Sequence, residues 1–276
     1  FEGADTDLYK VTNECSVPLA EQMDKIKENF NFLFVGHWLQ GGLGRDRKDV
    51  GMMIKTFLES YSSKHNVGLI LKTSGATPSK LDYDDLMFKV DEIKKIVNNQ
   101  DPPNIYILHG DLHDYEMNQL YNHPKVSAHI TFTHGEGFGR PLLEASLSGK
   151  PVIAPGWSGH VDFLDKRYAT LLGGGLVDVG EDSLPEAIFL KEMKWFMVNH
   201  KQAASTMKNV KRNYRRYKIA ARKLAKQNAA KFSFKSMVQY LNTLLDKSLP
   251  KFTQTVDVKL PNLKKLPKKL PKLEKA

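Results

Sequence analysis

The segment between residues 133 and 163 constrains the fold of this chain more than any other part of the sequence. An apolar run, Ala128–Phe132, leads into a glycine-rich turn, and a helical pattern with Pro141 in its first turn follows. Proline is tolerated there because first-turn N–H groups have no partner within a helix. Gly149-Lys150-Pro151 ends the helical pattern, and Val152–Ala154 begins another apolar run. The segment therefore predicts a strand, a tight turn, a helix and a second strand in direct succession.

The same alternation of short apolar runs and longer amphipathic patterns extends along most of the chain. Predicted strands are Phe32–Gly36, Gly68–Lys72, Ile105–Leu108, Ala128–Phe132, Val152–Ala154 and Ala169–Leu172. Predicted helices are Pro18–Asn29, Lys48–Ser63, Asp84–Asn99, Tyr115–Tyr121, Arg140–Ser148, Leu184–Asn199, one long basic helix over 203–231, and Phe232–Lys247. This order predicts an α/β fold with a parallel sheet and helices on both faces.

Parallel sheets of this kind bind ligands beyond the carboxyl ends of their strands. The segments expected to line one crevice there are Gly36–Asp49, Lys72–Ser79, His109–Asp114 and Thr133–Gly139. A glycine-rich turn that opens a helix also provides free N–H groups and the positive end of the helix dipole, which suit a phosphate. Two carboxylates, Glu136 and Glu144, flank this turn with seven residues between them.

A long ungapped series of residues in this segment matches a known motif. In order, the residues are Thr133, Glu136, Gly137, Phe138, Gly139, Pro141, Leu142, Leu143, Glu144, Ala145, Gly149, Pro151, Val152 and Ile153. The series resembles the donor-binding motif of group 1 (family 4-like) retaining GT-B glycosyltransferases. The resemblance implies a Rossmann-like, C-terminal donor domain. Such a domain helps to transfer a hexosyl group, with retention, from a nucleotide-diphosphate sugar to an acceptor that the sequence does not identify.

The beginning of the chain supports the same resemblance. Gly3–Tyr9 looks like the segment that leads into the second domain of such enzymes. We therefore expect an N-terminal acceptor-side GT-B domain to be missing from this chain, and we expect the chain to be inactive without it.

The resemblance also assigns roles to the motif residues. Glu144 would accept hydrogen bonds from the ribose hydroxyls of the donor, since a carboxylate accepts from two vicinal hydroxyls. Glu136 would lie beside the transferred sugar as a catalytic residue. The N–H groups of Gly137, Phe138 and Gly139 would face the sugar or the distal phosphate, and Thr133 opens the motif. The backbone of His109–Asp111 would meet the nucleobase.

Cations are needed to balance the leaving diphosphate, and here the chain departs from the family pattern. His37 stands where the family has arginine. Lys48 best matches the family lysine and is assigned a catalytic role, with Arg47 or Arg45 replacing the missing arginine. Lys72, at the end of a strand, is a further candidate for phosphate binding. The histidines show no metal-ligand spacing, so neither a metal nor any other cofactor is expected.

The net charge of +10 is unevenly distributed. Residues 1–199 carry a net charge of −8, whereas residues 200–231 carry 11 Lys or Arg and no acid. Proline punctuates a lysine-rich run after residue 250 and forbids a continuous helix. We therefore expect a donor domain over residues 1–249 and an extended basic tail over 250–276. Residues 200–276 are expected to meet an anionic partner, either a membrane surface or a nucleic acid.

Two other hypotheses about function remain open. The chain could be a non-catalytic nucleotide-sugar-binding module, or a DNA-binding or DNA-modifying protein that acts through its basic C-terminus. The single cysteine, Cys15, suggests a reducing compartment, and no apolar run approaches 18 residues. A cytoplasmic location, peripheral to a membrane if the basic region binds lipid, is expected.

Overall fold

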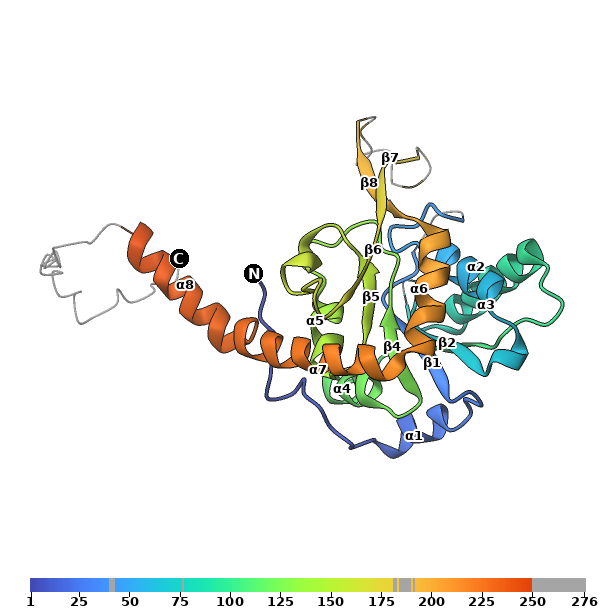
Figure 1. The fold of residues 1–276 in the computed structure, drawn as a ribbon, viewed down its shortest axis with the longest axis horizontal. Helices are drawn as coiled ribbons and strands as arrows, with labels where there is room; N and C mark the ends of the chain where they lie inside the picture. Colours follow the sequence, from blue (N-terminus) through green and yellow to red (C-terminus); the bar gives the residue numbers. More distant parts are fainter. Residues whose placement is uncertain (40–42, 76, 181–182, 184–189, 191, 250–276) are drawn as a thin grey trace, which may run out of the picture. The chain divides into compact units, whose positions relative to one another are not determined.

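A six-stranded parallel sheet forms the centre of the domain (Figure 1). The computed structural model describes residues 1–276 except 40–42, 76, 181–182, 184–189, 191 and 250–276. The strands are β1 (Phe30–Val35), β2 (Val67–Lys72), β3 (Ile105–Leu108), β4 (Val126–Ile130), β5 (Val152–Pro155) and β6 (Thr170–Leu172). Their order in the sheet is β3-β2-β1-β4-β5-β6, and every neighbouring pair is parallel. The predicted fold class is confirmed.

Helices cover both faces of the sheet, and the alternation of side chains along each strand supplies both layers. In β1, Phe32 and Phe34 pack in the core on one face, while Leu33 packs in the core on the other. The first face is covered by α2 (Val50–Ser60), α3 (Lys80–Val97) and α6 (His200–Arg212). The second face is covered by α1 (Val17–Met23), α4 (Asp114–Asn122), α5 (Arg140–Leu147) and α7 (Tyr214–Lys231).

An antiparallel hairpin replaces part of a predicted helix. β7 (Gly174–Asp178) pairs with β8 (Lys194–Val198), so the predicted helix Leu184–Asn199 is wrong over residues 194–198. Residues 184–189 and 191 of that prediction lie outside the described residues. In β8, Phe196 and Val198 are buried while Trp195 and Met197 are only partly buried, which is the period-two pattern of a strand. The apolar run of four residues, 195–198, is too short for periodicity alone to distinguish a strand from a helix.

The basic region also differs from the prediction of one long helix over 203–231. It forms two helices, α6 and α7, which meet at Asn213. Asn213 leaves the helical conformation, and its side-chain amide donates a hydrogen bond to Asn209 Oδ1 at 2.6 Å. The break lets α6 pack against α2 while α7 packs against α5. The predicted helix Pro18–Asn29 is likewise shorter and ends at Met23.

The last described helix is α8 (Phe234–Ser248). The chain divides into two compact units, Phe1–Gln239 and Tyr240–Ala276, so α8 begins in the first and ends in the second. None of the described helices has the length and apolar character needed to cross a bilayer.

The strand order places β1 and β4 side by side at the middle of the sheet. From β1 the chain proceeds outward through β2 and β3, and from β4 it proceeds in the opposite direction through β5 and β6. The loops after β1 and β4 therefore diverge at a topological switch point, where open α/β sheets form their ligand crevice. Residues 36–39 and 43–49 belong to the first loop, and residues 131–139 form the second.

Candidate functional site

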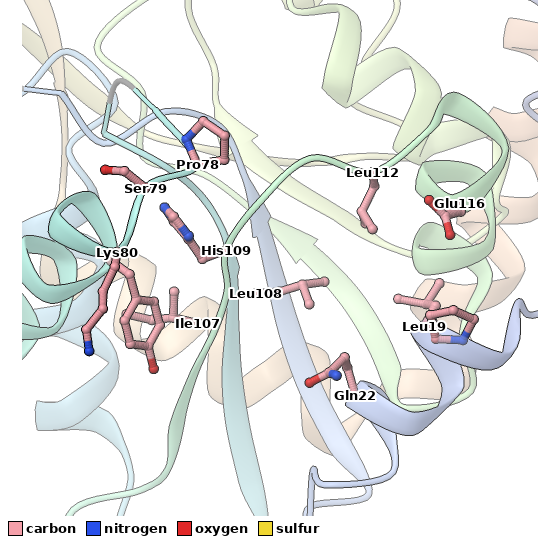
Figure 2. Close-up of a pocket in the computed structure, with 12 residues that line it drawn as sticks. Leu19, Gln22, Pro78, Ser79, Lys80, Ile107, Leu108, His109, Leu112 and Glu116 are labelled. Atoms are coloured by element: carbon pink, nitrogen blue, oxygen red, sulfur yellow. The ribbon is translucent and has the colours of Figure 1, made fainter.

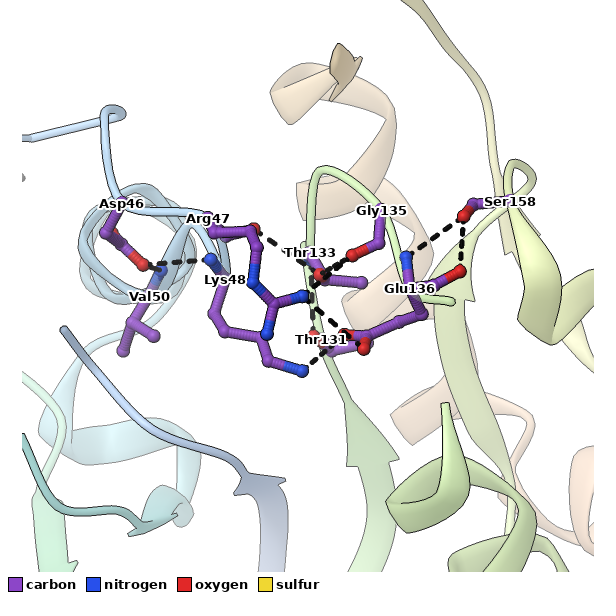
Figure 3. Close-up of polar contacts among 9 residues, drawn as sticks. All are labelled: Asp46, Arg47, Lys48, Val50, Thr131, Thr133, Gly135, Glu136 and Ser158. Carbon is purple, nitrogen blue, oxygen red and sulfur yellow. Dashed lines mark hydrogen bonds and ion pairs between the residues drawn. The ribbon is translucent and has the colours of Figure 1, made fainter. Parts of the chain in front are cut away.

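The loops after β1 and β4 are joined by polar contacts at the switch point (Figure 3). Lys48 Nζ forms an ion pair with Glu136 Oε1. Arg47 Nη1 donates a hydrogen bond to Gly135 O at 3.0 Å and lies 3.6 Å from Glu136 Oε2. The His134 N–H donates to Arg47 O at 2.9 Å. Lys48 and Arg47, two candidate cations, therefore contact the candidate catalytic carboxylate of Glu136, which is far from them in sequence.

Asp46 fixes the position of Lys48, a contribution that the sequence analysis did not detect. Its Oδ1 atom accepts hydrogen bonds from the N–H groups of Lys48 at 3.1 Å and Val50 at 3.2 Å. The Asp46 side chain is buried at the start of α2. First-turn N–H groups need such an acceptor, so the helix start and the site are built together.

The ion pair itself is mostly buried, with side-chain exposures of 14% for Lys48 and 11% for Glu136. Burial lowers the pKa of Lys48, and the neighbouring carboxylate opposes this shift. Burial acts to raise the pKa of Glu136, but the neighbouring cations of Lys48 and Arg47 outweigh it, so the pKa lies below its ordinary value. The carboxylate of Glu136 is therefore ionised at neutral pH.

The glycine-rich turn before α5 leaves its backbone donors available. Gly139 has a φ of 91° at the helix N-cap, a conformation that favours glycine. Within the described part of the chain, the N–H groups of Gly137, Phe138 and Gly139 donate no hydrogen bond. The Phe138 ring packs against Phe163, with ring centroids 5.0 Å apart, so this residue offers its backbone to the crevice.

The turn after β5 holds this loop from the other side. Ser158 Oγ donates to Glu136 O at 2.6 Å and accepts from Glu136 N at 3.0 Å. The N–H of Gly159 also donates to Glu136 O, at 3.0 Å. The loop is therefore fixed at Glu136 while the next three residues remain open.

This close approach gives the first testable prediction, which concerns Gly159→Ala. A Cβ atom at Gly159 would lie 1.9 Å from Gly137 O, so the turn and the loop must separate. We expect the free energy of unfolding in urea to fall by about 3 kcal/mol. Gly137→Ala in the same loop is the matched control, because its Cβ would meet no atom within 4 Å. Equal losses of stability in the two variants would contradict the predicted contact.

Glu144 lies one turn into α5 and is only 5% exposed. Its Oε1 is 3.0 Å from Arg140 Nε, and its Oε2 accepts a hydrogen bond from Tyr121 Oη at 3.3 Å. Burial raises the pKa of Glu144 to about 7, although Arg140 opposes the shift. Glu136 and Glu144 therefore have pKa values shifted in opposite directions within one short segment.

The remaining predicted cations make separate contacts. Lys72 Nζ donates to Gly110 O at 2.5 Å, and burial lowers the pKa of Lys72. His37 is exposed, with Nδ1 3.1 Å from Ser74 Oγ. Arg45 is exposed on the loop after β1. Of the predicted cations, the structure brings Lys48 and Arg47 to Glu136, whereas Lys72 and His37 contact other residues at the same edge of the sheet.

Thr133 lies buried between the two loops. Its hydroxyl donates to Gly135 O at 3.1 Å and approaches Arg47 O at 3.4 Å. The side chain thus stabilises the loop in which Glu136 stands.

A group of three residues, two of them buried, supports the site from behind and was not expected from the sequence. Asp49, fully buried with a φ of 50°, lies between His134 and His200. The Nε2 atoms of these histidines are 4.0 Å from Asp49 Oδ1 and 3.6 Å from Asp49 Oδ2, respectively. His134 Nδ1 donates to Phe196 O at 2.8 Å, and the ring stacks on Trp195. His134 thus joins the loop to β8 and, through Asp49, to α6.

A hollow of about 710 Å³ lies at the outer edge of the sheet rather than at the switch point (Figure 2). It is bounded by α1, α3, β3 and α4. Its lining includes His109, whose Nε2 is 2.8 Å from Asp82 Oδ2. The predicted nucleobase segment therefore borders this hollow. Among the described residues, no group of three or more His, Cys, Asp or Glu side chains is arranged to hold a metal ion.

Comparison with known protein families and sequences gives one distant relative. No family model matches the chain. The capsular polysaccharide biosynthesis glycosyltransferase CapM of Staphylococcus aureus is 28% identical over 141 residues, which are 50% of this chain. The matched region is 33% of CapM, so the chain spans about a third of the length of this relative.

Solved structures give a broader match. The C-terminal domain of LpcC, a glycosyl transferase group 1 family protein from Francisella tularensis, aligns with a TM-score of 0.56 and 17% identity over 84% of this chain and 100% of that domain. Anabaena Alr3699/HepE, in complex with UDP and glucose, aligns with a TM-score of 0.62 and 16% identity over 89% of this chain and 55% of HepE. A glycosyltransferase from Rickettsia africae gives a TM-score of 0.58 and 16% identity over 89% of this chain and 55% of that protein. The fold of this chain is therefore that of the Rossmann-like C-terminal domain of GT-B glycosyltransferases.

Proposed function

We propose that this chain is the donor-binding half of a retaining, family 4-like glycosyltransferase that uses a nucleotide-diphosphate sugar. One observation carries the proposal: Lys48 and Arg47 meet Glu136 at the switch point, next to the free N–H groups that begin α5. The distant similarity to CapM supports a glycosyltransferase. The structures of HepE with UDP and with UDP-glucose support a nucleotide-sugar ligand.

Each group has a distinct part in the proposed reaction. Lys48, Arg47 and the N–H groups of residues 137–139 stabilise the negative charge that develops on the departing diphosphate. Glu136 accepts hydrogen bonds from the transferred sugar. Glu144 accepts hydrogen bonds from the ribose hydroxyls.

The proposed stereochemical outcome is retention, by attack on the face that the diphosphate leaves. The leaving phosphate then accepts the proton of the acceptor hydroxyl. The cations of residues 47 and 48 perform the charge-neutralising role that a divalent metal has in other transferases, so full turnover in EDTA is expected. Closure of an acceptor-side domain over the crevice would exclude water and complete the site.

The direct test is calorimetry of the 276-residue chain with UDP, GDP and ADP. We expect one of these nucleotides to bind with a dissociation constant below about 1 mM, because Lys48, Arg47 and the N–H groups of residues 137–139 bind the diphosphate. The nucleoside of the bound nucleotide, which lacks phosphate, is the matched control and should bind much more weakly. Failure of all three nucleotides to bind at millimolar concentration would contradict the donor-site assignment.

Binding alone does not distinguish an enzyme from a non-catalytic nucleotide-sugar-binding module. A sugar-transfer assay with this domain joined to an acceptor-side domain distinguishes the two functions. Transfer with retention supports the enzyme, whereas nucleotide binding without transfer supports the module.

A further inference from the structure

Asp49 has a side chain that the start of α2 does not require. It is the N-cap residue of that helix, with a φ of 50°, in the left-handed region that is unfavourable for residues other than glycine. Its side chain makes no capping hydrogen bond. The carboxylate of Asp46 instead accepts the N–H groups of Lys48 and Val50. Neither the backbone conformation nor the capping of α2 therefore explains an aspartate at residue 49.

The carboxylate of Asp49 is also buried without a hydrogen bond. The exposed fraction of its side chain is 0%, and neither oxygen has a hydrogen-bond partner among the described residues. The Nε2 atoms of His134 and His200, which face the two oxygens at 4.0 and 3.6 Å, have no hydrogen-bond partner there either. Burying such polar groups costs free energy, so their arrangement calls for a functional explanation.

The surrounding charges link Asp49 to the two imidazoles. Burial raises the pKa of Asp46, the charge of Asp49 adds to this shift, and His134 opposes it. The cations of Arg47 and Lys48, on the same loop, pair instead with the carboxylate at the switch point. Within the described part of the chain, the groups with a cationic form within 4.0 Å of the Asp49 carboxylate are the two imidazoles.

The three side chains join three segments of the fold. Asp49 directly follows Lys48 in the loop after β1. His134 lies two residues before Glu136 in the loop after β4, and His200 is the first residue of α6. The loops after β1 and β4 are therefore linked twice. One link is the ion pair of Lys48 with Glu136 (Figure 3), and the other is the buried contact of Asp49 with His134.

These two links differ in what happens to them when a donor binds. A diphosphate needs the ammonium group of Lys48, so its binding draws that group away from the Glu136 carboxylate. We propose that Asp49 is a positioning residue of the donor site, whose buried carboxylate, between His134 and His200, keeps the loops after β1 and β4 in register. Asp49 acts through Lys48 rather than on the donor itself. This role rests on the proposed function, because the site that it positions is the one that binds the diphosphate.

The first test needs no nucleotide and compares the native chain with Asp49→Asn. Asparagine keeps the size of the side chain and tolerates the left-handed backbone, but it removes the charge. The measurement is the pKa of Glu136, followed by ¹³C NMR. Loss of a nearby negative charge would by itself lower this pKa, whereas loosening of the Lys48 contact would raise it towards its ordinary value. We expect the pKa to rise by about 0.5 or more.

The second test is a titration with whichever of UDP, GDP and ADP binds the native chain. Asp49→Asn should weaken the binding about tenfold, because a displaced ammonium group meets the diphosphate less well. In a chain that already carries Lys48→Met and Glu136→Gln, the same change should alter the affinity less than about twofold, since no ammonium group is left to position. A merely structural effect of Asp49 would weaken the binding equally in both backgrounds.

Three further variants serve as controls. Asp49→Gly suits the left-handed backbone and should behave as Asp49→Asn does, which assigns the effect to the carboxylate. His200→Gln removes one imidazole from a side chain that is 25% exposed, and it should change both measurements in the same direction by a smaller factor. Asp101→Asn, which precedes β3 at the amino end of the sheet, changes net charge equally and should leave both measurements at their native values. Urea unfolding shows that each variant folds.

The outcomes separate this role from the proposed function. A fall or no change in the pKa of Glu136 on losing the Asp49 carboxylate would overturn the positioning role, as would equal losses of affinity in the two backgrounds. If the native chain binds no nucleotide, the proposed function fails, and the pKa of Glu136 alone decides whether Asp49 positions Lys48. If Asp49→Asn binds the nucleotide as well as the native chain does, only the positioning role fails. Should Asp49→Asn not fold, the same measurements on His200→Gln decide the question.

Discussion

Lys48→Met is expected to reduce the free energy of unfolding by about 3 kcal/mol. The substitution keeps most of the apolar stem but leaves the Glu136 carboxylate without its nearest cation. Both side chains are mostly buried, and removing one member of a buried ion pair leaves an uncompensated charge. Arg47 lies 3.6 Å from the other carboxylate oxygen and is exposed, so it replaces only part of the interaction. Urea unfolding at neutral pH measures the change.

A second substitution separates the charge from the packing. Lys48→Met combined with Glu136→Gln removes both charges, so most of the lost stability should return. Lys55→Met is the control on a more exposed pair: Lys55 and Glu59 have side-chain exposures of 27% and 51%. Its expected cost is about 0.5 kcal/mol. Equal losses in the free energy of unfolding for Lys48→Met and Lys55→Met would show that the ion pair between Lys48 and Glu136 contributes no more than a more exposed pair.

The double variant Lys48→Met with Glu136→Gln also tests the proposal that Lys48 binds the diphosphate. Because it is stable but lacks the ammonium group, it should bind the preferred nucleoside diphosphate about 10- to 150-fold more weakly than the native chain. Wild-type affinity in this variant would remove Lys48 from the proposed site, while the fold assignment would stand.

The parts of the site that the sequence predicted are the ones built from neighbours along the chain. The strand, turn and helix around Gly139 follow from local turn chemistry and from a proline in the first turn, and the structure forms them at nearly the expected residues. The approach of Lys48 to Glu136 follows from the rule that parallel strands present their carboxyl ends at one edge.

The parts that sequence analysis missed depend on contacts between distant segments. His134 is fixed by Trp195 and Phe196, and Asp49 by His200, and in each case the partner lies more than 60 residues away in sequence. The sequence pattern of β8 becomes distinguishable from that of a helix only when its pairing with β7 is known. Asn213 breaks the basic helix because α6 and α7 pack against different helices, which no local propensity reveals.

Glu144→Gln is expected to change how stability depends on pH. The pKa of Glu144 is about 7 in the folded chain against an ordinary value of 4.5, so the folded state holds a proton that the unfolded state releases. The stability from this proton is complete below about pH 4.5, declines as pH rises and is lost above about pH 7. Its size is about 3 kcal/mol. Relative to the native chain, the glutamine variant should gain stability between pH 5 and pH 8, as measured by urea unfolding at each pH.

The same carboxyl group should make nucleotide binding depend on pH in the opposite direction. Ribose hydroxyls donate to the ionised carboxylate, and the ionised fraction rises about tenfold between pH 6 and pH 8 for a pKa near 7. Between pH 6 and pH 8, the affinity of the native chain for the preferred nucleoside diphosphate should therefore rise about tenfold more than the affinity of the Glu144→Gln variant. Comparing the two proteins removes the effect of the nucleotide's own titration, which is the same in both. Glu136→Gln is the matched control. In the native chain the pKa of Glu136 is lowered and its carboxylate stays ionised over this range, so replacing it should leave the pH dependence of binding unchanged. If Glu144→Gln shows the same pH dependence as the native chain, Glu144 does not bind the ribose.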